Sequence, residues 1–451
     1  MPLSSENPTL PCWWSARHLS VCNGNRFMSA MNSIGMSLHI VDIVVLVFMV
    51  LGAVGTALTT AQVLLAAGFL FRRSGRAFAT ARGIGASGTE ESGQRREDKK
   101  GRPVVTIIKP VSGIEDGLEM NLESFAHLEG PSYELIISVA DPDDPALPII
   151  DKVLPLFAEG MVRVVIGGAI RMDNPKVERL AAAARHATGE LLLISDSNVR
   201  VSNDYLAATL AEFDDPRVGC AVNLFVGDGA ASLGAALECL YIMTFVVPGT
   251  ILAACAGVTC VVGKSMAISS KVLQEIGGFE AFAQVLAEDQ SIVLAVARAG
   301  YRVALSPVLV HNVVQSRAIS GAVKRQVRWG KMRYSFSRFR YTSEFLCNPL
   351  PLLLVASTLS AVAGLSPVSE CALLTGSAVA ARILQAGALI HLTRAKLPRL
   401  SLLLVPVQDC IQAATQLVPY FSHQIDWRGF RTRLGRGTQI LEPRRAANSG
   451  T

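Results

Sequence analysis

Three long segments of this 451-residue chain are apolar enough to cross a membrane. Residues 43–71 contain no charged side chain, and a membrane-spanning helix needs about 20 apolar residues. Arginines follow this segment at once, so the positive-inside rule predicts that the next part of the chain lies in the cytoplasm. Near the other end, residues 345–369 also lack charge, and residues 371–392 carry one charged side chain, Arg382. The pattern predicts one N-terminal and at least two C-terminal membrane helices.

A further apolar segment, residues 400–421, is less suited to a span. Its most polar side chains are Gln408, Asp409, Gln412 and Gln416. Such groups are costly at the centre of a bilayer, and a third C-terminal crossing would leave the basic tail outside, against the charge rule. We therefore predict that this segment is re-entrant or interfacial and that the tail is cytoplasmic.

Between the apolar ends, short apolar runs alternate with amphipathic stretches. Repeated strand–helix units of this kind predict an α/β domain with a doubly wound, Rossmann-like sheet. The expected strands are residues 104–109, 133–139, 162–167, 191–194, 218–225, a pair within 258–269, and then 303–307 and 308–314. We also expect an apolar helix at residues 233–247, lying on the membrane surface, and a basic helix at 319–340 that leads to the membrane.

The remaining segments complete the predicted organisation. Residues 1–38 form an uncertain N-terminal extension, in which Met28, Met31 or Met36 is an alternative start. Residues 73–102 are rich in glycine, serine and mixed charge, which is typical of a flexible linker. The predicted parts are thus residues 1–38, 39–72, 73–102, 103–342, 343–422 and 423–451.

Charge and cysteine content narrow the class of protein. The formal net charge is +6, and basic side chains gather beside the apolar segments. The basic clusters are Arg72, Arg73 and Arg76; Arg333, Arg338 and Arg340; and Arg428, Arg431, Arg433 and Arg436. This placement suits anionic lipid head groups better than nucleic acid. The nine cysteines include no CxxC pair, which indicates neither a disulfide framework nor a zinc site and favours a reducing, cytoplasmic location.

Acidic side chains follow two of the predicted strands. Asp196 comes after the apolar run 191–194, and ligands of open α/β sheets bind beyond the carboxyl ends of such strands. Its carboxylate could hold a hard divalent ion that neutralises the diphosphate of a nucleotide sugar. Asp141, followed by Asp143 and Asp144, could accept hydrogen bonds from a nucleotide base or ribose. Ordinary turn and helix-cap chemistry is an alternative for both groups.

Two further groups are candidates for chemistry. Glu288 and Asp289 begin a predicted helix, where a carboxylate can cap the helix or act as general base towards an acceptor hydroxyl. Arg325 and Arg328 share a helix face next to Trp329. Guanidinium groups can bind a diphosphate and an indole can stack on a sugar. The alternative is a basic interfacial helix anchored by its tryptophan.

Taken in order, these segments resemble the ceramide glucosyltransferase family, one of the inverting GT-A membrane glycosyltransferases of families 21 and 2. The motifs that carry the resemblance are TIIKPVSG, YELIISVADPDDPA, NPKVERL, ISDSNVRV, CVVGKSMAI, GGFEAFAQVLAED and RQVRW. They cover about residues 104–340. The resemblance implies a GT-A-type, Rossmann-like mixed sheet with one N-terminal and two to three C-terminal membrane helices.

The resemblance also implies roles for individual residues. It suggests Asp289 as the catalytic base and Asp196 as the ligand of Mg²⁺ or Mn²⁺. The implied donor-binding residues are Lys109, Asp141, Lys176 and Asp196, and the implied diphosphate and acceptor residues are Arg325, Arg328 and Trp329. Lys176 also stands at the start of a predicted helix, where a phosphate is favoured. Asn198 departs from the family pattern, since it leaves no complete Asp-x-Asp motif.

The implied activity is transfer of glucose from UDP-glucose to the hydroxyl of ceramide. The protein would be a multi-pass integral membrane protein with a cytoplasmic catalytic domain. Its partners would be a UDP-sugar donor, a membrane lipid acceptor and the membrane, without nucleic acid. The alternatives are another lipid acceptor, such as a hopanoid polyol or a diacylglycerol, and a non-catalytic relative that binds UDP or lipid.

Overall fold

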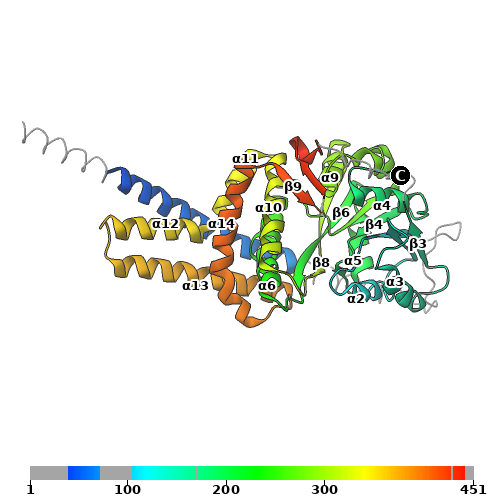
Figure 1. Ribbon diagram of the computed structural model, residues 1–451, viewed down its shortest axis with the longest axis horizontal. Coiled ribbons are helices and arrows are strands. Elements are labelled where there is room, and N and C mark those ends of the chain that lie inside the picture. The colour runs from blue at the N-terminus through cyan, green and yellow to red at the C-terminus, as the bar shows by residue number, and fades with distance from the viewer. Residues whose placement is uncertain (1–38, 72–103, 168–170, 428–429, 442–451) are drawn as a thin grey trace, which may run out of the picture.

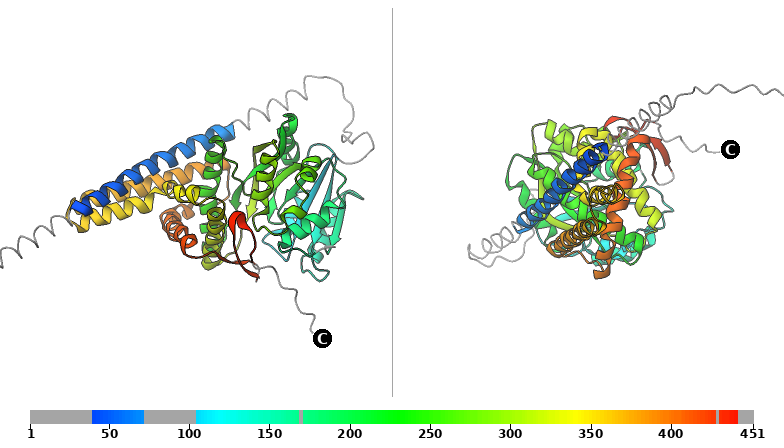
Figure 2. Two further views of the ribbon diagram at one scale, coloured as in Figure 1. Left: turned by 90° about the horizontal axis from the view of Figure 1, so that it is seen from above. Right: turned by 90° about the vertical axis from the view of Figure 1, so that its left-hand side faces the viewer.

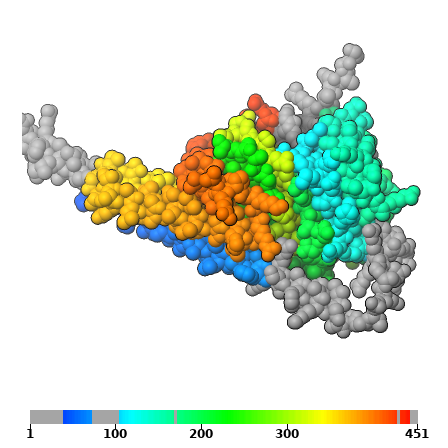
Figure 3. All heavy atoms as spheres, turned by 90° about the horizontal axis from the view of Figure 1, so that it is seen from below, coloured from blue at the N-terminus to red at the C-terminus, as the bar shows by residue number. Residues whose placement is uncertain are grey.

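The computed structural model describes residues 39–71, 104–167, 171–427 and 430–441. A sheet with flanking helices occupies one end of the molecule, and long helices project from the other (Figure 1). In the space-filling view the N-terminal helix and a C-terminal helical hairpin form one narrow rod that leaves the broader α/β part (Figure 3). The predicted extension and linker, residues 1–38 and 73–102, lie outside the described residues.

The α/β part is built on an eight-stranded sheet. The strands are β1 (Val105–Val111), β2 (Tyr133–Val139), β3 (Val162–Ile166), β4 (Leu191–Ser195), β5 (Val199–Arg200), β6 (Val218–Asp228), β7 (Ser265–Ser269) and β8 (Arg302–Val313). Their order is β3-β2-β1-β4-β7-β6-β8-β5. The first four are parallel, and β7 lies antiparallel between β4 and β6. The sheet is therefore mixed, and β4 and β6 end at the same edge.

Helices cover both faces of the sheet. Every residue of β1 is buried; Ile107 packs with Phe125 on one face, and Ile108 packs with Val177 on the other. A strand covered on both faces forms a continuous apolar run, which is why the sequence predicted it. The first face carries α2 (Leu118–Glu123), α3 (Leu147–Val153) and α5 (Tyr205–Leu210). The second carries α4 (Pro175–Ala184), α8 (Ser270–Glu275) and α9 (Glu288–Arg298).

The predicted strand pair at residues 258–269 is wrong, because only β7 is a strand. In the segment before β7, two backbone N–H groups donate to side chains instead of to a neighbouring strand. Val261 donates to Oε1 of Gln290 at 2.9 Å, and Gly263 donates to Oδ2 of Asp289 at 2.6 Å. The segment is therefore shaped by the N-terminal turn of α9.

The two strands predicted around Pro307 form one strand, β8. The register of β8 against β6 shifts beside Pro307, between Asn223 and Leu224 of β6. Proline has no N–H to donate to a ladder and is tolerated within sheets at such irregularities.

An apolar helical segment, Leu233–Cys255, passes through the middle of the molecule. It consists of α6 (Leu233–Tyr241), a π-helical turn (Ile242–Val246) and α7 (Val247–Cys255). Of its apolar stretch, 89% is buried inside the protein. The prediction that residues 233–247 lie on the membrane surface is therefore wrong. An interfacial helix needs one polar face open to water, and this segment is covered by other parts of the protein instead.

The predicted basic helix is α10 (Ile319–Phe336). It ends earlier than predicted because Ser337 starts a new helix, α11 (Arg338–Ser343), by accepting a hydrogen bond from the N–H of Arg340. The change of direction at Ser337 leads the chain to the apolar C-terminal helices.

Among the described residues, three helices are long and apolar enough to cross a membrane, by length and composition: His39–Phe71, Leu233–Cys255 and α13 (Val368–Thr393). A fourth candidate is the pair of Arg338–Cys347 and α12 (Pro349–Val362), which is bent by 68°. The predicted apolar helices are thus present at both ends of the chain. Their orientation in a membrane stays a prediction.

The N-terminal helix runs along α12 and α13 (Figure 2). A Cβ added at Gly52 would lie 2.4 Å from the side chain of Leu353, and one at Gly55 would lie 2.7 Å from the carbonyl oxygen of Leu346. Small residues at such positions allow helices to pack closely within a bilayer. The two ends of the chain therefore form one helical unit.

The last helix, α14 (Val405–Phe421), runs across this rod, beside α10 (Figure 1). Its polar side chains face the protein: Gln408 exchanges hydrogen bonds of 3.1 and 3.2 Å with Gln326 of α10, and Asp409 pairs with Arg382 of α13. This orientation is the one expected of the interfacial segment, whose place in a membrane stays a prediction. After α14, the hairpin β9 (Gln424–Trp427) and β10 (Phe430–Arg433) returns to the α/β part.

Candidate active site

Asp196 begins the turn at the carboxyl end of β4. Its N–H donates to the carbonyl oxygen of Lys264 at 3.1 Å. Below it, the ammonium group of Lys109 donates to the Asp196 carbonyl at 3.0 Å and to Oγ of Ser195 at 3.3 Å. Burial lowers the pKa of Lys109 to about 7, against the attraction of Asp196. Lys109 is fully buried and holds the turn; its predicted contact with the donor stays a prediction.

Two lysines neutralise the carboxylate of Asp196. Nζ of Lys176 lies 2.8 Å from Oδ1, and Nζ of Lys264 lies 2.9 Å from Oδ2. Burial alone would raise the pKa of Asp196, but the two ammonium groups outweigh it and hold this pKa well below its usual range. The side chain of Asp196 remains 20% exposed. A charged and reachable carboxylate therefore stands at the sheet edge.

Lys176 also joins Asp196 to a second acid, Glu288. Asn174 caps α4 and accepts a hydrogen bond from the Lys176 N–H, so Lys176 projects from the first turn of the helix. Its Nζ lies 2.7 Å from Oε1 of Glu288. Burial raises the pKa of Glu288, although Lys176 opposes this. Burial alone would lower the pKa of Lys176, but the carboxylates around it, those of Asp196, Glu288 and Asp289, raise it above its usual value. One ammonium group thus brings acids from two distant segments together.

Asp289 stands beside Glu288 in the first turn of α9. Its Oδ2 accepts the N–H of Gly263 at 2.6 Å, and its Oδ1 accepts the N–H of Gln290 at 2.8 Å. A Cβ added at Gly263 would lie only 2.3 Å from the Cβ of Asp289. The close approach that fixes the Asp289 carboxylate therefore requires glycine at position 263.

The C-terminal segment fixes the loop before α9. The N–H of Leu286 donates to the carbonyl oxygen of Thr438, and the N–H of Ala287 donates to its hydroxyl, both at 3.0 Å. On the other side, Nδ2 of Asn174 donates to the carbonyl oxygen of Val285 at 2.7 Å. Thr438 is fully buried with φ of 64°, a left-handed conformation that is unusual for a β-branched residue. The chain end thus takes part in positioning the loop of Asp289.

Asp141 lies at the same edge of the sheet, after β2 and separated from β4 by β1. It is exposed, and its Oδ1 accepts the N–H of Asp143 at 2.9 Å. Asp144 binds the N–H of Gly113 with both carboxylate oxygens. The turn chemistry that we considered as an alternative is therefore present. Within the described residues no contact joins Asp141 to Asp196, and its role in donor binding stays a prediction.

Trp329 of α10 reaches the carboxyl end of β6, at the edge where β4 also ends. Its ring centroid lies 6.3 Å from that of Phe225 on β6 and 6.0 Å from that of Tyr241 on α6. The helix of the RxxRW motif thus meets the same edge of the sheet as Asp196.

A buried acid orients the first arginine of that motif. Glu238 of α6 is 1% exposed, and its Oε1 lies 2.8 Å from a terminal nitrogen of Arg325. Its Oε2 lies 2.7 Å from Nε of Arg317, in the segment before α10. Because Glu238 is almost fully buried and Arg325 is 18% exposed, this ion pair restricts where the Arg325 side chain can point. The predicted roles of Arg325, Arg328 and Trp329 at diphosphate and acceptor stay predictions.

The donor set for a divalent ion is small. Among the described residues, no group of three or more His, Cys, Asp or Glu side chains is arranged to hold a metal ion. Asp196 offers the hard carboxylate oxygen that Mg²⁺ and Mn²⁺ prefer, and it is partly exposed at the sheet edge. It fits as a single protein ligand, with the other ligands supplied by phosphate oxygens and water.

Sequence reasoning missed three residues that build this site: Gly263, Lys264 and Thr438. The first two stand next to each other in the motif CVVGKS, where a glycine between a strand-like run and a lysine is a usable signal. Thr438 gave no signal, because its partners are distant in sequence.

The mixed sheet, with acids and ammonium groups paired at its carboxyl edge and apolar helices beyond it, agrees with the membrane glycosyltransferase fold that the sequence resemblance implies. The sequence model of glycosyl transferase family 21 matches residues 63–440, and the chain belongs to that family. The predicted family resemblance and fold class are confirmed.

Three curated relatives that the chain resembles are all ceramide glucosyltransferases by name. The chain is 28% identical over 272 residues to ceramide glucosyltransferase 3 of Caenorhabditis elegans, which covers 58% of each protein. It is 27% identical over 237 residues to ceramide glucosyltransferase 1 of the same organism, covering 51% of this chain and 50% of that protein. It is 32% identical over 114 residues to the ceramide glucosyltransferase of Candida albicans, covering 23% and 21%. The chain thus spans 58% and 50% of the length of the two C. elegans relatives and 21% of the length of the Candida protein.

Solved structures show weaker likeness. The mannosyltransferase PcManGT of Pyrobaculum calidifontis, solved with GDP-Man and Mn²⁺, is 19% identical and has a TM-score of 0.38, covering 81% of this chain and 99% of that one. TarS of S. aureus in complex with UDP-GlcNAc is 12% identical and has a TM-score of 0.34, covering 75% of this chain and 99% of that one.

Proposed function

We propose that this chain transfers glucose from UDP-glucose to the primary hydroxyl of ceramide. The observation that carries the proposal is the ion-paired cluster in which Lys176 joins Asp196 to Glu288, beside Asp289. The same edge of the sheet receives the RxxRW helix, which leads through α11 to the apolar helices. The names of the curated relatives support both the sugar and the lipid.

The donor side of the reaction falls to the charged cluster. Lys176 and Lys264 would present positive charge to the diphosphate, and Asp141 would contact the uridine. A divalent ion held by Asp196 would supply further neutralisation of the departing diphosphate. Such preorganised charge is usually the largest single contribution to catalysis.

The acceptor side falls to Asp289. Its carboxylate would take the proton of the lipid hydroxyl while that oxygen attacks the anomeric carbon of the sugar. The carbon–oxygen bond to the diphosphate breaks on the opposite face, and UDP leaves with the electron pair, so the anomeric configuration inverts. Backbone N–H groups of Gly263 and Gln290 hold both carboxylate oxygens in place for this step.

The membrane places the acceptor. The apolar helices at both ends of the chain would anchor the protein with its α/β part in the cytoplasm, where Trp329 and its neighbours would meet a lipid head group. The buried helix α6 supports Arg325 through Glu238 and does not itself form the lipid surface.

The test is lipid mass spectrometry on membranes that contain the full chain, supplied with UDP-glucose and ceramide. We expect a hexosylceramide that disappears with Asp289→Asn and persists with Asp151→Asn, a matched change at an exposed position of α3. Hexosylation of a hopanoid polyol or a diacylglycerol instead of ceramide would overturn the acceptor. Binding of UDP without any hexosylated lipid would overturn the catalytic role.

A further inference from the structure

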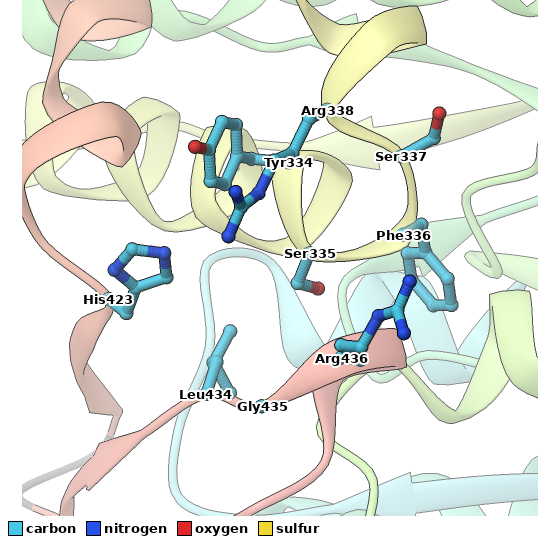
Figure 4. Close-up of a pocket in the computed structure, with 9 residues that line it drawn as sticks. All are labelled: Tyr334, Ser335, Phe336, Ser337, Arg338, His423, Leu434, Gly435 and Arg436. Atoms are coloured by element: carbon cyan, nitrogen blue, oxygen red, sulfur yellow. The ribbon is translucent and has the colours of Figure 1, made fainter.

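A cavity of about 630 Å³ lies between the end of α10 and the C-terminal segment, away from the Asp196 cluster. Figure 4 shows Ser335 pointing into the open space, with Arg338 reaching over Tyr334 on one side and His423 and Arg436 on others. None of the residues that line this cavity is acidic. The proposed glycosyl transfer assigns it no role.

The basic groups of the cavity favour an anion. The Arg338 guanidinium lies 5.4 Å above the ring centroid of Tyr334, which in turn packs edge-on against His423 at 5.7 Å. The arginine is thereby held over the cavity. Arg436 is exposed and has no ion-pair partner within the described part of the chain. Guanidinium groups are the usual recognition chemistry for phosphate.

The surroundings of the cavity favour a lipid as the source of that phosphate. Phe339, next to Arg338, is 84% exposed, and Phe421, two residues before His423, is 85% exposed. Highly exposed phenylalanines beside arginines are typical of a surface that inserts at the membrane interface. The elements that carry them, α11 and α14, are those that meet the apolar rod.

We propose that this cavity binds the phosphate head group of an anionic phospholipid. Arg338 and Arg436 pair with the phosphate, and Phe339 and Phe421 enter the acyl boundary. Leu434 and Arg436 in the cavity wall belong to the segment whose Thr438 holds the loop before α9. An occupied cavity therefore steadies the segment that supports the active site.

The test is native mass spectrometry of the full chain released from nanodiscs of phosphatidylcholine with added phosphatidylglycerol. We expect one retained phosphatidylglycerol, reduced at least about fivefold by the double change Arg338→Gln with Arg436→Gln. The double change Lys271→Gln with Arg298→Gln removes the same charge from exposed positions far from the cavity and should leave retention unchanged. The pair Arg338→Lys with Arg436→Lys should restore it in part.

Three results would overturn the proposal. They are equal retention by wild type and the glutamine double variant, equal retention of phosphatidylcholine and phosphatidylglycerol, and displacement of the lipid by millimolar inorganic phosphate. Circular dichroism of each variant checks that the fold is kept. Because the readout is bound lipid and not glycosyl transfer, failure here leaves the proposed function standing, and the reverse also holds.

Discussion

Two ion-paired carboxylates in this protein differ in their solvent exposure and in the kind of cation that pairs with them. Asp196 at the sheet edge faces two lysines and keeps 20% exposure, whereas Asp409 between α13 and α14 is fully buried against Arg382. Arg382 donates Nε and a terminal nitrogen to the two oxygens of Asp409 at 2.7 and 3.0 Å. Lysine is a mobile point charge, whereas arginine is a rigid fork that locks a carboxylate.

This contrast distinguishes a carboxylate that can take part in chemistry from one that only joins helices. A partly exposed carboxylate held by two lysines can exchange those partners for an ion or a substrate. A carboxylate held by a guanidinium fork without solvent access can only join elements. Asn348, which precedes α12, donates to the Asp409 carbonyl at 2.7 Å, so this position fixes three helices at once.

The largest expected effect is on the open carboxylate. Asp196→Asn should lower the transfer rate by about 10³-fold, because charge stabilisation of a leaving group contributes on that scale. The amount of folded protein should stay near that of wild type. The measurement is specific activity per mole of folded protein. EDTA should abolish wild-type activity, and added Mg²⁺ or Mn²⁺ should restore it in wild type but not in Asp196→Asn. Wild-type activity that persists in EDTA would contradict a metal site at Asp196.

A change at Asp409, the carboxylate buried against Arg382, should lower the amount of folded protein and leave the specific activity unchanged. Asp409→Asn leaves the Arg382 charge buried and unpaired, which destabilises a protein by about 3–5 kcal/mol. We expect loss of folded protein from the membrane, with normal activity in whatever remains. The double change Arg382→Met with Asp409→Leu should recover most of the yield, since well-packed apolar residues can replace a buried pair. If the double variant recovers no folded protein, the charges of Arg382 and Asp409 are themselves needed between α13 and α14.

A smaller effect tests the position of the base. Gly263→Ala places a Cβ within 2.3 Å of the Asp289 Cβ and must displace that side chain. A shift of about 1 Å in a catalytic group can lower the rate by about 10²-fold. We expect a fall in kcat with little change in KM for the donor. Gly376→Ala, in a helix with open space around it, is the matched control. An unchanged kcat in Gly263→Ala would exclude this positioning role.

The smallest effect is the pH dependence of stability that Lys109 contributes. Its pKa is about 7 in the folded protein, against 10.5 for a lysine that is fully solvated in an unfolded chain. Between these two values the unfolded chain binds more protons, so stability from this group rises with pH from about 7 towards 10 and is lowest below 7. The melting temperature of wild type relative to Lys109→Met should increase between about pH 6.5 and 9. A constant difference would mean that Lys109 keeps one protonation state throughout.

Much of this molecule could be predicted from local pattern. Strands buried on both faces leave apolar runs, and β1, β2 and β4 were recognised this way because their burial is continuous. The acid at the end of β4 and the acid pair at the start of α9 were recognised because each follows an apolar run. The segment at 258–264 was misjudged because its apolar residues lie between side-chain hydrogen bonds and not in a ladder.

The sequence alone therefore determined which segments are apolar, which strands end in an acidic residue, and which family the motifs resemble. Each of these features depends only on residues that are close together in the chain. Only the tertiary structure decided what each acid meets. Lys264 reaches Asp196 because β7 is inserted antiparallel beside β4. Thr438 reaches the loop before α9 because the C-terminal segment folds back against that loop. Hydrophobic periodicity shows which face of a helix or strand is buried, but it does not show the order of the strands in the sheet. The tertiary structure was therefore needed to identify these residue pairs.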